Sequence, residues 1–172
     1  MAGKKALVVI DLQNDYLWEK RKKMFNYDTK QLVGNVNNAI ESYQEQGYDI
    51  LYVVHLLPNI VTNKIFIGFS IKGTPGADIY SKVNIVSDKL FEKHFSDTYT
   101  SKAFREHMAK ENYTEVAICG LDLCGCVGAT AKGARKTGVR VTMIEDCIGC
   151  RFSEEKAKAK KEELNAIGVH FI

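Results

Sequence analysis

The chain has 172 residues, of which 45% are hydrophobic, and its 24 lysines and arginines against 21 aspartates and glutamates give a net charge of +3. This length fits one domain spanning residues 1–172, and the composition excludes a disordered or collagen-like chain. Basic and acidic residues are interleaved, so no nucleic-acid partner is expected. The five cysteines are an odd number, which favours reduced thiols over a disulfide framework.

Residues near the start of the chain resemble neither an export signal nor a membrane span. Their apolar run, Ala6–Ile10, has only five residues and ends at Asp11. This is too short for a signal-peptide core or a transmembrane helix. We therefore expect a cytoplasmic protein with no membrane partner.

The first half of the chain alternates between strand-like and helix-like patterns. Ala6–Ile10 is nearly unbroken in its apolar character, which is typical of a parallel strand buried on both faces. Apolar residues at spacings of three and four predict an amphipathic helix from Thr29 to Gln46. Asp49–Val54 predicts the second strand. The segment Leu56–Val86 contains both prolines and three glycines, so we expect an irregular loop region there.

The second half continues the alternation. We expect four further strands and two further helices, the strands at Lys89–Glu92, Glu115–Cys119, Val139–Ile144 and Val169–Ile172 and the helices at residues 126–136 and 153–166. Strand and helix in alternation, joined by right-handed crossovers, predict an α/β fold with a parallel sheet.

Several reactive side chains follow the predicted strands. Asp11, His55, Lys93 and the segments 120–126 and 146–150 all fall at carboxyl ends of strands, where binding sites of parallel sheets lie. One carboxylate, one ammonium group and several thiols are therefore expected at one edge of the sheet.

Cys126 is the best candidate nucleophile. It is expected to open a helix, where free backbone N–H groups and the positive helix end would favour a thiolate and could bind an oxyanion. Asp11 can take the thiol proton, and Lys93 can pair with the thiolate. Taken singly, each residue also has a structural interpretation: Cys126 as a small core residue, Asp11 as a turn cap and Lys93 as a solvated strand end.

Four blocks in the correct order resemble the isochorismatase-like cysteine hydrolases. They are Ala6–Asp15, Gly73–Ala77, Lys93–Ser96, and Gly120–Val127 followed by Thr130, Ala131 and Ala134. The resemblance implies a Rossmann-like three-layer sandwich with a mostly parallel six-stranded sheet and helices on both faces. Members include nicotinamidases, N-carbamoylsarcosine amidohydrolases and ureidoacrylate hydrolases.

The resemblance also implies a catalytic triad of Asp11, Lys93 and Cys126. The thiolate attacks an amide carbonyl, ammonia or an amine leaves, and water hydrolyses the thioester. Backbone N–H groups of Asp122 and Cys126 are expected to form the oxyanion hole, after a cis peptide between Leu121 and Asp122. The substrate is then a small molecule, and no cofactor is expected.

One departure concerns metal ions. Metal-containing nicotinamidases resemble one another in an Asp-x-His pattern plus a second histidine after the second strand. This chain has His55 alone there, preceded by valines, and its next histidine is His94. We therefore expect no metal, and we interpret His55 as a hydrogen-bonded strand-end residue of the substrate pocket.

The other thiols allow two further interpretations. Cys124 and Cys126, with Cys147 and Cys150 twenty residues later, imitate a four-cysteine zinc pattern. Alternatively, Cys124 or Cys150 could resolve an oxidised Cys126. Cys119 is expected to pack in the core.

Aromatic side chains after the first strand are expected near the substrate. Tyr16, Trp18 and Phe25 are candidates for the pocket wall. Trp18 could equally cover a dimer interface, since homo-oligomers are common among proteins that resemble this family. The leading hypothesis is thus a cysteine amidohydrolase that forms a homo-oligomer. The alternatives are a thiol-redox or zinc-binding protein on the same scaffold, and a family member without catalytic activity.

Overall fold

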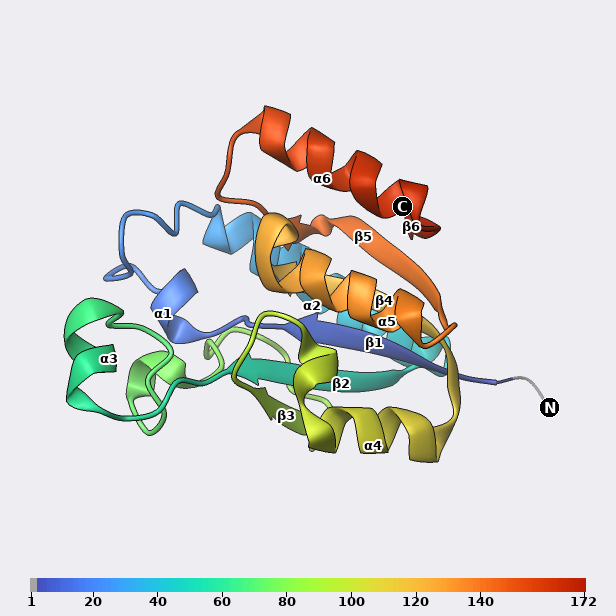
Figure 1. The fold of residues 1–172 in the computed structure, drawn as a ribbon, viewed down its shortest axis with the longest axis horizontal. Coiled ribbons are helices and arrows are strands. Elements are labelled where there is room, and N and C mark those ends of the chain that lie inside the picture. The colour runs from blue at the N-terminus through green and yellow to red at the C-terminus, as the bar shows by residue number, and fades with distance from the viewer. Residues whose placement is uncertain (1–2) are drawn as a thin grey trace.

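The computed structural model describes residues 3–172, which form a single sheet covered by helices on both faces (Figure 1). Its strands are β1 (Lys4–Ile10), β2 (Asp49–His55), β3 (Leu90–Lys93), β4 (Tyr113–Leu121), β5 (Arg140–Gly149) and β6 (Val169–Phe171). They lie in the order β3-β2-β1-β4-β5-β6, and every pairing is parallel. The predicted α/β class is therefore confirmed, with an entirely parallel sheet.

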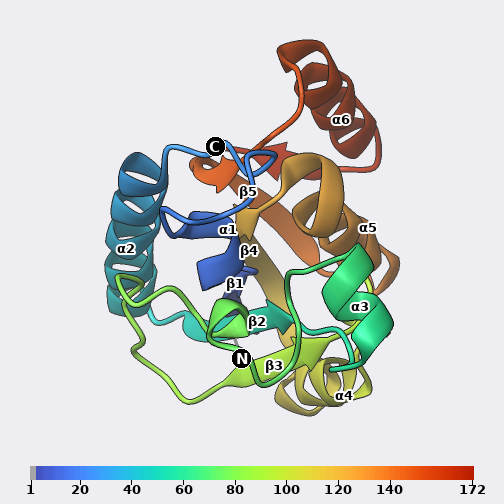
Figure 2. The ribbon, with the colours of Figure 1, turned by 90° about the vertical axis from the view of Figure 1, so that its left-hand side faces the viewer.

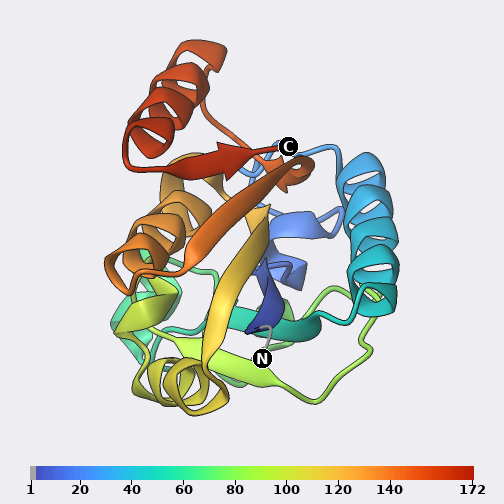
Figure 3. The same ribbon diagram turned by 90° about the vertical axis from the view of Figure 1, so that its right-hand side faces the viewer.

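Four longer helices cover the two faces of the sheet. They are α2 (Thr29–Glu45) on one face, and α4 (Lys102–Glu111), α5 (Gly128–Lys136) and α6 (Glu154–Ala166) on the other (Figure 3). Two short helices, α1 (Asn14–Leu17) and α3 (Val61–Phe66), lie instead at the carboxyl edge of the strands, which faces the viewer in Figure 2. None of the helices within residues 3–172 is long and apolar enough to cross a membrane.

The central strand explains why the sheet is buried on both faces. Ala6, Val8 and Ile10 pack with the α4, α5 and α6 layer, whereas Leu7 and Val9 pack with α2. Successive side chains of a strand point to opposite faces, so an apolar run supplies both cores at once. Each of these five side chains is at most 2% exposed.

Three differences from the expected elements matter for the site. Helix α4 was not predicted, and β5 continues past Ile144 to Gly149. Cys126 does not open α5, because that helix begins at Gly128. A separate helical turn, Leu123–Val127, precedes it and is kinked at Gly125, where φ and ψ are −120° and −119°.

The region Leu56–Val86 is irregular, as expected, but it is tied closely to the end of β1. The buried side chain of Gln13 donates to the carbonyl oxygens of His55 and Ala77 at 3.0 and 2.8 Å, and it accepts from the His55 N–H at 2.8 Å. Asp15 accepts from the Ser70 N–H at 2.7 Å. These bonds fold the long loop over the carboxyl edge of the sheet.

Candidate active site

Asp11 and Lys93 form a buried ion pair at the carboxyl edge. Lys93 Nζ lies 2.9 Å from Asp11 Oδ2, and their side chains are 0% and 3% exposed. Burial disfavours the charged form of Lys93, but the Asp11 charge and the nearby Cys126 sulfur outweigh it, and the pKa of Lys93 is raised. The ammonium form is therefore stable inside the protein.

The backbone at Asp11 has an unusual conformation. Its φ is +54°, in the left-handed region that side chains rarely adopt, and its N–H donates to Val53 O at 2.9 Å. Neighbouring Gly120 has φ +114°, and a Cβ there would lie 2.0 Å from Ile10 O. Only glycine permits this close approach of β4 to the end of β1.

One oxygen of Asp11 has no hydrogen-bond partner. Oδ2 is bound by Lys93, whereas Oδ1 is buried and unpartnered within the described part of the chain. A buried acceptor without a donor is costly unless a reacting group supplies the donor. Asp11 is therefore poised to accept a proton.

Cys126 lies beside this pair, and Cys126 and Asp11 both line one pocket at the carboxyl edge of the sheet. Burial and the Asp11 charge raise the pKa of the Cys126 thiol to about 12, although Lys93 opposes them. Lys93 lowers the thiol pKa, as expected, but burial and Asp11 outweigh it, so the free protein does not favour the thiolate that the sequence led us to expect. Desolvation and a carboxylate both disfavour a second negative charge, so a neutral thiol faces Asp11.

Asp122 anchors the turn that carries Cys126. The Leu121–Asp122 peptide is cis, as the resemblance implied. Asp122 Oδ1 accepts from the Cys124 N–H at 2.9 Å, and Oδ2 accepts from the Tyr27 hydroxyl at 2.9 Å and the Arg151 N–H at 2.7 Å. The side chain thus joins three segments, in addition to the backbone role expected from the sequence.

The pocket above these groups is small and largely aromatic, with a volume of about 160 Å³. It is lined by Asp11, Tyr16, Phe25, Tyr27, His55, Phe69, Ser96, Leu121, Asp122, Gly125, Cys126 and Arg151. Of the four residues expected in its wall, Tyr16, Phe25 and His55 line it and Trp18 does not. Tyr16 and Trp18 are two residues apart at the end of the short helix α1, so their side chains point to different sides. The Trp18 ring instead lies 4.0 Å from Lys20 Nζ.

Three lining residues were not singled out in the sequence: Tyr27, Phe69 and Arg151. Phe25 packs edge-on against Phe69, with ring centroids 5.1 Å apart. Arg21 shapes the loop that carries Phe25, since its guanidinium donates to the carbonyl oxygens of Phe25 and Tyr27 at 2.6 and 3.0 Å.

His55 is a neutral pocket residue. Burial and Lys93 lower its pKa. Its Nε2 lies 3.3 Å from His94 O, and because a carbonyl only accepts, Nε2 is the donor. Nδ1 is left as the acceptor nitrogen.

The remaining thiols do not form the four-cysteine zinc site. Cys147 packs in the α2-side core with Cys119, whereas Cys126 and Cys150 pack against the opposite core. Cys124 and Cys150 are neighbours, with their sulfur atoms 3.8 Å apart. The sheet therefore separates Cys147 from the other cysteines of the expected four-cysteine pattern.

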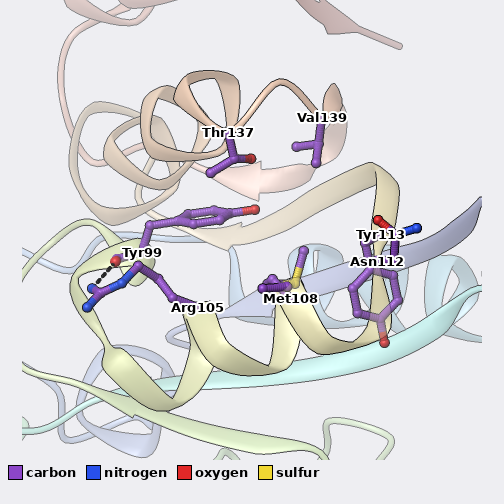
Figure 4. A pocket seen from close by; sticks show the side chains of 8 residues that line it. Tyr99, Arg105, Met108, Asn112, Tyr113, Thr137 and Val139 are labelled. Atoms are coloured by element: carbon purple, nitrogen blue, oxygen red, sulfur yellow. Dashed lines mark hydrogen bonds between the residues drawn. The ribbon is translucent and has the colours of Figure 1, made fainter.

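A larger cavity of about 380 Å³ lies elsewhere (Figure 4). Helix α4 forms one wall with Arg105 and Met108, and the start of β4 and the residues before β5 form the rest, including Tyr113 and Val139. This places it toward the amino ends of the strands, away from Cys126. The smaller pocket, which contains the reactive groups, is therefore the candidate active site.

Comparisons with known proteins identify the family and agree with the fold. A family model described as the isochorismatase domain matches residues 5–172. An uncharacterized isochorismatase family protein of Bacillus subtilis, YddQ, is 23% identical over 142 residues, which are 82% of this chain and 75% of that protein.

Solved structures share the fold at low sequence identity. The pyrazinamidase of Pyrococcus horikoshii, in complex with zinc, is 21% identical with a TM-score of 0.83, and the alignment covers 98% of each chain. The N-carbamoylsarcosine amidase of Thermoplasma acidophilum is 23% identical with a TM-score of 0.80, over 98% of this chain and 95% of that one.

The zinc in one of these structures raises the question of a metal near His55. Valines precede His55, and its ring nitrogen Nε2 is bonded to the His94 carbonyl. Among residues 3–172, no group of three clustered histidine, cysteine or acidic side chains includes His55. The residues around His55 do not fit a metal ion.

Proposed function

The chain belongs to the isochorismatase family, and from this premise we propose that it is a cysteine amidohydrolase that cleaves a carbon–nitrogen bond of a small amide or carbamoyl compound. One observation carries the proposal. Asp11 has one carboxylate oxygen bound to Lys93 and the other buried without a partner, beside the neutral thiol of Cys126. A base, a counter-ion and a nucleophile are thus adjacent.

In the first half of the reaction, Asp11 Oδ1 takes the thiol proton and Cys126 Sγ attacks the substrate carbonyl carbon. The carbonyl oxygen becomes an oxyanion, and the backbone N–H groups of Asp122 and Cys126 donate to it. Asp11 then returns its proton to the leaving nitrogen as the carbon–nitrogen bond breaks. Ammonia or an amine departs, and an acyl group remains on Cys126 as a thioester.

In the second half, Asp11 removes a proton from water, which attacks the thioester carbonyl. The carbon–sulfur bond breaks, and the proton passes from Asp11 to Cys126 Sγ. Lys93 stays protonated throughout, because its pKa is raised. Its fixed positive charge stabilises whichever of Asp11 and Cys126 is anionic.

The pocket favours a small, flat substrate. Its walls contain Phe25, Tyr27 and Phe69, and Tyr16 binds Ser70 through its hydroxyl. A volume of about 160 Å³ leaves room for one small ring or a short carbamoyl compound. The names of the similar structures, a pyrazinamidase and an N-carbamoylsarcosine amidase, support both kinds of compound as candidates.

The proposal is tested by measuring ammonia release from a panel of aromatic amides, carbamoyl amino acids and ureides. The wild type should release ammonia from at least one compound, and Cys126→Ala should lose this activity. Cys147→Ala is the control, since its sulfur packs in the opposite, α2-side core, and it should retain activity. Equal rates in wild type and Cys126→Ala would exclude the mechanism.

We also propose that the protein is a cytoplasmic homo-oligomer. Its five cysteines are all free, which suits a reducing compartment. Helix α3 exposes Val61, Ile65 and Phe66 by 69%, 70% and 81%, an apolar surface that a second copy would cover. Light scattering should show an oligomer that Phe66→Ser weakens; a monomer in the wild type would contradict the proposal.

A further inference from the structure

Two thiols and a carboxylate converge beside the proposed active site. The ligand atoms of Asp122, Cys124 and Cys150 all lie within 4.8 Å of one another, the one such group of three found among residues 3–172. Cys124 follows β4, and Cys150 follows β5, so the cluster bridges two neighbouring strand ends. The reaction proposed above uses neither thiol.

The separation of the two sulfurs matches that of a metal-bound pair. Cys124 Sγ and Cys150 Sγ are 3.8 Å apart. Two sulfurs bound to zinc at about 2.3 Å in a tetrahedron of about 109° are separated by about 3.8 Å. A disulfide requires about 2.05 Å, so the pair would have to close by more than 1.5 Å to form one. A metal ion therefore needs less movement than oxidation does.

Asp122 retains the capacity to act as a third ligand. Its Oδ1 accepts one hydrogen bond, from the Cys124 N–H, whereas Oδ2 accepts two. A carboxylate oxygen has two acceptor positions, so one position on Oδ1 is still available. The carbonyl oxygen of Lys156, 3.7 Å from Cys124 Sγ, is a further oxygen close to the site.

We propose that Asp122, Cys124 and Cys150 bind one zinc ion per chain. Two thiolates select a thiophilic ion over magnesium or calcium, and two sulfurs with one oxygen leave a fourth position for water or the Lys156 carbonyl. As the zinc–sulfur bonds form, each thiol gives its proton to solvent, and the ion loses water molecules. The ion would fix the turn after β4 to the segment after β5.

This site differs from the four-cysteine pattern in the sequence and does not involve His55. Cys126 stays outside it, so the proposed nucleophile remains free. Half-burial of both thiols leaves a path for the ion from solvent. Burial and the neighbouring Cys150 raise the pKa of Cys124 to about 11, and Lys160, which is paired with Glu163, only partly opposes them, so the ion has to displace the thiol proton as it binds.

The test is a zinc titration of the reduced, metal-free, full-length chain against a chromophoric chelator. The wild type should bind one zinc ion and gain about 5 °C in Tm when saturated. Cys150→Ser should bind at least about tenfold more weakly, because a thiolate ligand is lost. Cobalt(II) in place of zinc should give thiolate charge-transfer absorption in the wild type and much less in Cys150→Ser.

Two variants make the test decisive. Cys147→Ser is the matched control, since Cys147 is buried in the α2-side core, and it should bind zinc as the wild type does. Cys126→Ala should also retain binding. Loss of binding in Cys126→Ala with retention in Cys150→Ser would overturn the proposal. A wild type that binds no zinc would also overturn it, as would a purified wild type with only three free thiols, because two cysteines would then form a disulfide.

Discussion

Asp11 Oδ2 accepts a hydrogen bond from Lys93 Nζ at 2.9 Å across the end of β2, and both side chains are almost completely buried. β2 separates their two strands in the sheet, so the pair forms only when three parallel strands end at the same level. The pair is therefore a property of the fold as well as of the proposed reaction.

Loss of one partner should be costly. Lys93→Met leaves the buried Asp11 carboxylate without its counter-ion, and we expect a loss of about 3–5 kcal/mol in the free energy of unfolding. Lys89→Met, which breaks the part-exposed pair with Asp49, should cost no more than about 1 kcal/mol. Urea unfolding measures both; similar losses would contradict the argument from burial.

The contribution of Lys93 to stability should depend on pH in a defined direction. Its pKa in the folded protein is raised above the usual 10.5. A group of this kind stabilises the folded state fully below its unfolded-state pKa, and this stabilisation is lost as pH rises through the folded pKa. The stability difference between wild type and Lys93→Met should thus be constant from pH 6 to 9 and shrink above about 10.5. A difference that shrinks below pH 8 would contradict this.

The Cys126 thiol should be slow to react with iodoacetamide despite lining a pocket. Its pKa is raised to about 12 by burial and Asp11, so the rate should still increase with pH above 9. Asp11→Asn removes the negative charge and should shift this rise to lower pH while abolishing turnover. Peptide mass spectrometry measures modification at Cys126. A rate in the wild type that is constant above pH 8 would show that the thiol is already ionised.

Gly120 should be indispensable for the geometry of Asp11. In Gly120→Ala, the new Cβ would lie 2.0 Å from Ile10 O, at a φ of +114°. We expect a loss of at least about 3 kcal/mol in the free energy of unfolding and little residual activity. Gly34→Ala is the matched control, because no atom lies within 4 Å of its Cβ position in α2, and it should be about 0.5–1 kcal/mol more stable. Thermal unfolding and ammonia release compare the two; equal stability would contradict the argument.

Arg151 should select substrates that carry a carboxylate. Its side chain lines the pocket, lies 5.6 Å from the Phe25 ring, and has no ion-pair partner among the described residues. Arg151→Leu should raise KM for carboxylate-bearing amides by about 10–100-fold, because the charged hydrogen bond between the guanidinium and the substrate carboxylate is lost. Neutral amides should be unaffected. An equal rise in KM for both classes would indicate a structural role, and Arg151→Lys should recover part of the affinity.

Local patterns predicted the elements that form the centre of the fold. Ala6–Ile10 is an unbroken apolar run because its side chains supply both cores, and Thr29–Gln46 has a clear helical period because one of its faces packs in the α2-side core. Helix α4 was missed because only Phe104 and Met108 are buried in it, which is too sparse for a recognisable stripe. The expected helix from residue 126 failed for a local reason, since the kink at Gly125 separates the Cys126 turn from α5.

The candidate site was likewise only partly predictable from the sequence. Asp11, Lys93 and Cys126 were found because each follows a strand, and strand ends in a parallel sheet share one edge. The contacts of Asp122 with Tyr27 and Arg151 span 95 and 29 residues, so no short pattern could indicate them. The lowered pKa of His55 and the raised pKa of Cys126 both depend on burial, which the sequence does not specify.

The most direct test of Cys126 as the nucleophile is mass spectrometry of the intact chain and of its peptides, sampled while the protein hydrolyses an amide substrate. If Cys126 is the nucleophile, the chain mass should rise transiently by the mass of the acyl group less the displaced thiol hydrogen. The increase should lie on the peptide that contains Cys126 and be absent from Cys126→Ala. An acyl group on Cys124, or steady turnover by Cys126→Ala, would contradict it.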